Sequence, residues 1–196
     1  MNRAGVIIVL SIGILTLLLW WLVNRPGMEP PWPAQIAGVS FSPIRGYQDP
    51  AIGEFPSLKD IDADMALLAG DVRGLRTYTV QATMAEVPRL AAAHGLDVTL
   101  GAWINNQADF NAAELDRLLQ TYQDNPRQVV RMIVGNESIH REDQTVSELI
   151  GYIRRVQQEV SVPVSTAEPW HLWIEHPELV DAVDFIAVHL LPYWEG

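Results

Sequence analysis

The chain lacks cysteine, so disulfide bonds and thiolate metal sites are excluded. Basic residues are also scarce, because 13 Lys and Arg stand against 24 Asp and Glu, for a formal net charge of -11. An acidic surface repels phosphate, so we expect no nucleic-acid partner. The same balance is compatible with neutral partners such as sugars.

Several catalytic and cofactor motifs are missing as well. The sequence has no Gly-rich phosphate loop after an early strand-like segment and no nucleophile elbow. His171 and His189 form no His-x-x-x-His pair, and no acidic cluster at ligand spacing accompanies them. We therefore predict no metal and no organic cofactor.

One long apolar run lies near the start of the chain. Residues 4–23 carry no charge and are rich in Ile, Leu and Val, and about 20 such residues cross a bilayer as a helix. Arg3 and Arg25 flank the run, and Trp20 and Trp21 lie at its end, as is common at membrane interfaces. A cleaved signal peptide is the alternative. The run is longer than a usual signal core, so an uncleaved anchor is favoured.

The remainder of the chain predicts two further segments. We expect an anchor over residues 1–25, a stiff Pro-rich linker over 26–36 and a folded domain over 37–196. The domain is long enough to bury a sizeable core. The lipid bilayer, contacted through residues 4–23, is a predicted partner.

Short apolar segments alternate with longer amphipathic ones throughout this domain. The expected strands are 37–41, 74–78, 97–101, 129–134, 162–165 and 183–188. The expected helices are 57–68, 84–93, 111–122, 143–160 and 177–183. Such regular alternation predicts an α/β fold with parallel strands and right-handed crossovers.

Two architectures fit this alternation, a doubly wound open sheet and a (β/α)8 TIM barrel. The open sheet often carries a Gly-rich loop, which is absent here. Polar or aromatic residues instead follow every predicted strand, as at the rim of a barrel. We therefore predict an incomplete barrel of about six strand–helix units, missing roughly two of the usual eight.

The fourth predicted strand carries the strongest functional signal. Its apolar, β-branched run ends in Gly135, Asn136 and Glu137, although a carboxylate at the end of a buried strand is costly unless something uses it. Glycosidic cleavage needs an acid for the leaving oxygen and a second carboxylate nearby. An amide beside the acid can bind a sugar hydroxyl. We therefore take Glu137 as a candidate catalytic acid and Asn136 as its substrate-binding neighbour.

The identity of a second carboxylate is left open by the spacing. Glu168 ends the fifth strand, next to the fourth, and strands about 4.8 Å apart allow the ~5 Å separation of retaining enzymes. Glu195 follows the sixth strand. A sugar-binding role is favoured for Glu168. Arg76, at the end of the second strand, needs an anionic partner, and a catalytic carboxylate is a candidate.

Aromatic residues also collect behind the predicted strands. Flat rings stack on the C–H faces of sugars, although packing beneath the loops is the alternative for any single one. The residues in question are Trp103, Trp170, Trp173, Tyr193 and Trp194.

Six short motifs together resemble one known family. They are Gly38-Val-Ser-Phe-Ser42, Arg76-Thr-Tyr78, Leu100-Gly-Ala-Trp-Ile104, Val134-Gly-Asn-Glu137, Val164-Ser-Thr-Ala-Glu-Pro-Trp170 and His189-Leu-Leu-Pro-Tyr-Trp-Glu-Gly196. The combination resembles bacterial members of glycoside hydrolase family 17, which are β-1,3-glucanase-like domains often found with membrane-bound β-glucan synthases. The resemblance covers nearly all of residues 37–196.

The resemblance implies a (β/α)8 barrel and a retaining hydrolase or transglycosylase acting on β-1,3-glucan. It implies that Glu137 is the acid/base. The predicted substrate-binding residues are Asn136, Arg76, Tyr78, Trp103, Glu168, Trp170, His189 and Tyr193. The family's nucleophilic Glu belongs to a seventh strand, which lies outside the six predicted here. We therefore expect this chain to be inactive alone, and neither Glu168 nor Glu195 is promoted to nucleophile.

The sequence also predicts a cellular location and leaves two alternative functions open. With the anchor, the resemblance predicts a single-pass protein of the bacterial inner membrane whose domain faces the periplasm. A non-catalytic, membrane-tethered glucan-binding module remains an alternative. An open-sheet protein with an unrelated small-molecule function is another.

Overall fold

The computed structural model describes residues 2–25, 31, 33–191 and 193. Internal contacts divide the chain into two units, residues 1–33 and 34–196. In the first unit, α1 (Arg3–Val23) begins behind Asn2, whose side chain accepts the Gly5 N–H. Its length and composition are enough to cross a membrane, and a signal sequence would meet the same criteria. Much of the predicted linker lies outside the described residues, so the predicted segment boundaries stay predictions.

The second unit contains a six-stranded parallel sheet whose strands are ordered as in the sequence. Neighbouring strands all pair in parallel, with register shifts between β3 and β4 and between β4 and β5. This sequential order lacks the reversal of a doubly wound sheet, so the open-sheet alternative is wrong. The strands are β1 (Val39–Ser40), β2 (Gly74–Arg76), β3 (Asp97–Ala102), β4 (Val129–Asn136), β5 (Val164–Pro169) and β6 (Ala187–His189).

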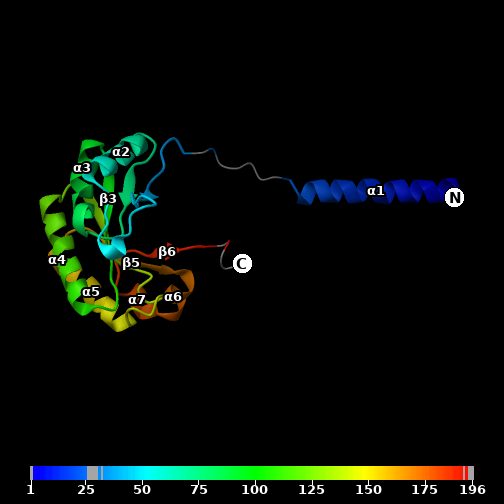
Figure 1. The fold of residues 1–196 in the computed structure, drawn as a ribbon. Helices are drawn as coiled ribbons and strands as arrows, with labels where there is room; N and C mark the ends of the chain where they lie inside the picture. The colour runs from blue at the N-terminus through cyan, green and yellow to red at the C-terminus, as the bar shows by residue number, and fades with distance from the viewer. Residues whose placement is uncertain (1, 26–30, 32, 192, 194–196) are drawn as a thin grey trace. The chain divides into compact units, whose positions relative to one another are not determined.

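The sheet curls strongly, as a contact between two distant strands demonstrates. Nη1 of Arg76, on β2, lies 3.2 Å from Nε2 of His189, on β6. In a flat sheet these strands would be about 19 Å apart, at four strand spacings. The sheet is therefore a half-barrel, and the predicted TIM-type fold class is confirmed (Figure 1).

Helices cover the outer face of the curled sheet (Figure 1). Short 3-10 turns, η1 (Pro50–Ile52) and η2 (Ala82–Glu86), lie in the loops after β1 and β2. The helices of this unit are α2 (Leu58–Leu68), α3 (Val87–Ala93), α4 (Ala108–Asp124), α5 (Val146–Glu159), α6 (Trp170–Glu175) and α7 (Pro177–Val180).

Local signals explain where two of these helices begin. Ser57 caps α2 by accepting the Asp60 N–H, and Thr145 with Glu148 forms a capping box at the start of α5. The apolar stripes of the helices then pack on the outward side chains of the strands. That core includes the fully buried Ile61, Met65, Leu100, Leu115, Leu118, Met132, Leu149 and Ile153.

Two predicted strands near the carboxyl end of the chain need new boundaries, and one helix there was not predicted. β5 continues to Pro169 rather than ending at 165, because its hydroxyls are satisfied internally; Thr166, for example, donates to Gly135 O. β6 is confined to Ala187–His189, since the Asp184 carboxylate accepts the Val164 N–H in the turn before it. The short helix α6 follows β5 directly and was not predicted.

Candidate active site

Glu137 occupies the loop position that directly follows β4. Its N–H donates to Ala167 O at 2.7 Å, which attaches this residue to the neighbouring strand β5. Glu137 has a φ of 55° and Gly135 a φ of 85°. A Cβ on Gly135 would lie 2.8 Å from Ser138 Oγ, so only glycine fits there. A left-handed conformation costs a non-glycine residue about 1–2 kcal/mol, a strain common at functional sites.

The Glu137 carboxylate contacts a histidine of β6, the next strand but one along the sheet. Oε1 of Glu137 lies 2.6 Å from Nδ1 of His189. The other ring nitrogen, Nε2, faces the Arg76 guanidinium, which can only donate. Nε2 must therefore accept, and we assign the neutral tautomer in which Nδ1–H donates to Glu137. In this arrangement Oε1 of Glu137 accepts the hydrogen bond from the His189 ring.

Arg76 connects this pair to the predicted amide neighbour. Its Nη2 donates to Asn136 Oδ1 at 2.7 Å, and its guanidinium lies 4.8 Å from the centre of the Tyr78 ring. Burial lowers the pKa of Arg76, while nearby Tyr78 and Glu137 raise it; an arginine nonetheless stays charged at neutral pH. Within the described residues, Nε of Arg76 is a buried donor without a partner. Five predicted site residues therefore meet here: Arg76, Tyr78, Asn136, Glu137 and His189.

Glu168 has a different environment from the one predicted. Its side chain is fully buried, and its two oxygens accept the N–H groups of Ile139 and His140 at 3.1 and 3.4 Å. Burial raises the pKa of Glu168, opposed by these backbone hydrogen bonds and by the charge of Arg141. Glu168 thus holds the loop that follows Glu137 and presents no surface to a sugar in this structure.

Arg141 is a site residue that the sequence reasoning missed. Its Nη1 donates to Asn136 O, its Nη2 to Ile104 O at 2.9 Å, and its guanidinium lies 4.2 Å from the Trp103 ring centre. Arg141 therefore joins the loops after β3 and β4 and supports the Trp103 ring. An arginine within a loop has no local pattern that would have identified it.

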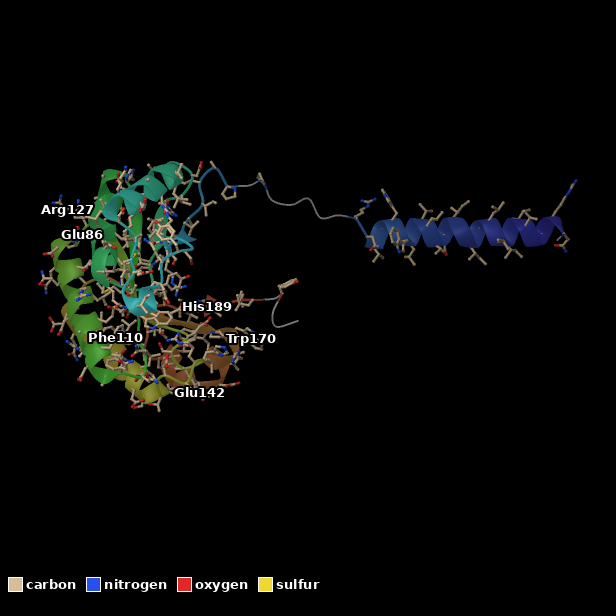
Figure 2. All side chains as sticks on the ribbon, in the orientation of Figure 1. Glu86, Phe110, Arg127, Glu142, Trp170 and His189 are labelled. Carbon is tan, nitrogen blue, oxygen red and sulfur yellow. The ribbon has the colours of Figure 1, made fainter. Side chains whose placement is uncertain are left out.

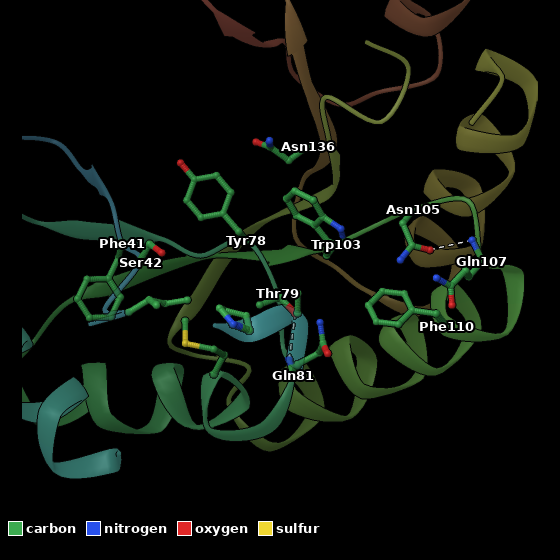
Figure 3. A pocket seen from close by; sticks show the side chains of 14 residues that line it. Phe41, Ser42, Tyr78, Thr79, Gln81, Trp103, Asn105, Gln107, Phe110 and Asn136 are labelled. Carbon is green, nitrogen blue, oxygen red and sulfur yellow. Dashed lines mark hydrogen bonds between the residues drawn. The ribbon is translucent and has the colours of Figure 1, made fainter. Parts of the chain in front are cut away.

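A cavity of about 850 Å³ adjoins the Asn136 amide. Tyr78 and Trp103, both predicted to bind substrate, form its walls together with Phe41 and Phe110, which were not predicted (Figure 3). Rings and amides in one concave surface are typical of carbohydrate binding, because sugars present both C–H faces and hydroxyls.

The remaining predicted aromatics have different positions. Trp173 is buried, and its Nε1 donates to Glu168 O at 3.2 Å, so of the two alternatives left open for it, packing beneath the loops applies. Trp170 begins α6 and is exposed, with its ring 5.8 Å from that of His171 (Figure 2). Tyr193 is also exposed. Trp194 and Glu195 lie outside the described residues. The substrate-binding roles of Trp170 and Tyr193 stay predictions.

The described part of the chain holds no candidate metal site. No group of three His, Asp or Glu side chains gathers there in a way that could hold an ion. His189 and Glu137 are instead engaged with each other and with Arg76. The chemistry available to this cluster is therefore hydrogen bonding and proton transfer by side chains.

Comparisons with solved structures agree with this architecture. An active-site mutant of Rhizomucor miehei β-1,3-glucanosyltransferase, in complex with laminaritriose, superposes with a TM-score of 0.70 and 25% identity. The match covers 82% of this chain and 59% of that one. The crystal structure of the same glycoside hydrolase family 17 enzyme also gives a TM-score of 0.70, at 24% identity.

Comparisons with sequences identify the family. Glucan 1,3-beta-glucosidase BGL2 of Candida albicans is 28% identical over 163 residues, covering 73% of this chain and 52% of that protein. Glucan 1,3-beta-glucosidase of Saccharomyces cerevisiae is 24% identical over 162 residues, covering 74% and 51%. The chain spans about half the length of these curated relatives. The profile of the BtgE/BtgC glycoside hydrolase domain matches residues 38–196, and the chain therefore belongs to that family of glycoside hydrolases.

Proposed function

We propose that the domain takes part in retaining hydrolysis or transglycosylation of β-1,3-glucan, with Glu137 as the acid/base. The observation that carries this proposal is the contact of Glu137 with His189 in a cluster that also holds Arg76 and Asn136, beside an aromatic cavity. The names of the relatives, glucan 1,3-beta-glucosidases and a β-1,3-glucanosyltransferase, support the same substrate class.

The proposed role of Glu137 has two steps. Protonated Glu137 gives its proton to the leaving glycosidic oxygen, and the resulting carboxylate then takes a proton from water or from an acceptor sugar. The Nδ1–H of His189 orients this carboxylate. Arg76 holds the Asn136 amide where it can bind a sugar hydroxyl next to the reacting carbon.

The retaining reaction also needs a nucleophilic carboxylate. The family resemblance implies that it belongs to a seventh strand, outside the six strands described. Glu168 is not a candidate, because it is fully buried and occupied by two backbone N–H groups. We therefore propose that this chain binds glucan and contributes the acid/base, and that turnover requires a second carboxylate.

The decisive experiment measures reducing ends released from laminarin. The chain would be assayed both as it is and extended by the coding sequence downstream of it, each with Glu137→Gln and Glu142→Gln variants. Glu142 is an exposed acid in the same loop, also with positive φ, and serves as the matched control. Loss of about 10²–10⁴-fold in turnover for Glu137→Gln alone is expected of an acid/base. Equal turnover in both variants would overturn the proposal.

A non-catalytic glucan-binding module is the second candidate. The burial of Glu168 favours it, because the other carboxylate at a neighbouring strand end is withdrawn from the surface. This candidate predicts saturable binding of laminari-oligosaccharides without turnover in either preparation. Binding that is unaffected by Glu137→Gln, together with turnover that is absent throughout, would select it.

We further propose that α1 anchors the domain in the bacterial inner membrane, with residues 34–196 on the periplasmic side. The support is a helix long and apolar enough to span a bilayer. Protease added to intact spheroplasts should degrade the domain and leave a membrane-embedded amino-terminal fragment. Protection of the domain, or its release as a soluble cleaved product, would contradict this location.

A further inference from the structure

Helix α4 carries a buried carboxylate that the proposed reaction does not use. Glu114 is 3% exposed and faces the sheet among Leu115 and Leu118. No ion pair involving Glu114 occurs among the described residues. A buried carboxylate without a cation is costly unless hydrogen bonds satisfy it, so its contacts should reveal what it does.

The contacts of Glu114 connect two separate loops. Its Oε1 accepts Thr79 Oγ1–H at 2.6 Å and the Val80 N–H at 2.9 Å, both in the loop after β2. The same oxygen accepts the Trp103 N–H at 3.2 Å, in the loop after β3. One side chain therefore ties together the loops that carry the Tyr78 and Trp103 rings.

A second residue of α4 holds the next part of the same surface. Asn111, fully buried one turn earlier, accepts the Asn105 N–H at 2.9 Å and donates to Asn105 O at 2.7 Å. Tyr78, Trp103, Asn105 and Phe110 all line the cavity beside Asn136, whereas Glu114 does not (Figure 3). Helix α4 thus fixes the walls of the cavity from behind.

We infer that Glu114 is a positioning residue that sets the spacing of the Tyr78 and Trp103 walls and thereby governs affinity for the glucosyl units beyond the one at Glu137. The inference rests on the proposed glucan function. In the proposed function, Arg76, Asn136 and His189 bind the sugar at Glu137, whereas the hydrogen bonds of Glu114 go to the loops of Tyr78 and Trp103. Longer oligosaccharides, which reach the aromatic walls, depend on Glu114, and the shortest ones do not.

The first test measures hydrogen exchange at the two backbone N–H groups that donate to Glu114. In the full chain, Glu114→Ala should speed hydrogen exchange at Val80 and Trp103, because their N–H groups lose their acceptor. Glu114→Gln should preserve slow exchange, since its amide oxygen can occupy the position of Oε1. Asp116→Ala is the matched control, because Asp116 lies exposed on the same helix and pairs only with Arg155 in the described structure.

The second test measures affinity against chain length. Laminaribiose and laminarihexaose would be titrated by calorimetry into full-length Glu137→Gln protein, alone and combined with each Glu114 variant. Glu114→Ala should weaken laminarihexaose binding about tenfold, the scale of one or two aromatic contacts, and laminaribiose binding little. Glu114→Gln and Asp116→Ala should bind both as the parent does.

The outcomes separate this inference from the proposed function. An equal loss for both oligosaccharides, or unchanged amide exchange in Glu114→Ala, would overturn the positioning role while leaving the glucan function intact. A parent protein that binds neither oligosaccharide would overturn the proposed function and the affinity role together. Selective loss for laminarihexaose with rescue by Gln would establish the inference.

Discussion

Glu137 and Glu168 lie at the ends of neighbouring strands, β4 and β5, but their carboxylates have different surroundings. The Glu137 side chain is 27% exposed and accepts a hydrogen bond from the His189 ring. The Glu168 side chain is fully buried and accepts two backbone N–H groups of the loop after Glu137. Glu137 lies among side chains contributed by other strands, and Glu168 is committed to the main chain.

The contrast between Glu137 and Glu168 means that a carboxylate at a strand end is not by itself a site for chemistry. Only one oxygen of Glu137 is occupied among the described residues, by the hydrogen bond with His189. The side chain therefore remains partly accessible. Both oxygens of Glu168 accept backbone N–H groups, and these hydrogen bonds hold the loop that follows Glu137 in place. The same residue type therefore supports the site in one position and is available to act in the other.

The largest effect should come from alanine at the two positions. Glu168→Ala should lower the free energy of unfolding by about 3 kcal/mol, because it leaves two buried N–H groups unpaired and creates a cavity. Glu137→Ala should change it by less than about 1 kcal/mol, since its side chain is partly exposed. Urea unfolding of the full chain in detergent, followed by tryptophan fluorescence, measures both. Equal losses would break the distinction between the two carboxylates.

The next effect tests whether side chains from other strands organise the Glu137 environment. Arg76→Lys keeps the charge but loses the planar fork that reaches both Asn136 and His189. Affinity for laminarihexaose should fall about tenfold, the scale of one charge-assisted hydrogen bond. Calorimetric titration measures it, and Arg73→Lys, at an exposed residue nearby, is the control. If Arg76→Lys binds laminarihexaose as tightly as the wild type does, Arg76 does not contribute to glucan binding.

A smaller effect concerns the backbone strain at Glu137. Glu137→Gly should raise the free energy of unfolding by about 1 kcal/mol, because glycine adopts its φ of 55° without penalty. Glu142→Gly, at a φ of 59°, should give a similar gain and calibrates the measurement. A loss at Glu137 with a gain at Glu142 would mean that the contact with His189 outweighs the strain.

The smallest effect is a pH dependence that arises at Glu168. Because burial raises the pKa of Glu168 above its ordinary value of 4.5, the folded state holds this proton after the unfolded chain has released it. This contribution to stability is complete below pH 4.5 and is lost as the pH rises through the folded-state pKa. Glu168→Gln should remove that decline from the urea-unfolding profile, whereas Glu142→Gln should retain it. An unchanged profile in Glu168→Gln would refute the assignment.

Residue patterns predicted most elements of the domain but not every boundary. Periodicity located most helices and strands, and Ser57 marks a true helix start. The helix expected from residue 143 begins only after its cap, Thr145. Helix α6 was missed because it has only six residues and follows β5 without a loop. The polar residues of β5 suggested an early end, since their internal hydrogen-bond partners are distant in sequence.

At the site too, local sequence patterns predicted some features, whereas others depend on residues that are distant in the sequence. Helical periodicity could have predicted that Glu114 faces inward, because this residue lies on the buried face of α4 between Asn111 and Leu118. Its three donors come from two other loops, and no local pattern indicates them. The burial of Trp173 likewise depends on how α6 packs after β5.

The sequence by itself determined the strand–helix order and the position of Asn136 and Glu137 at a strand end, because both follow from local periodicity and residue type. Only the tertiary structure decided which side chains meet there. Arg76 lies 60 residues from Asn136 and 113 from His189, and the curl of the sheet brings all three together. It also decided that Glu137 is accessible while Glu168 is buried, since that depends on which loops cover each strand end.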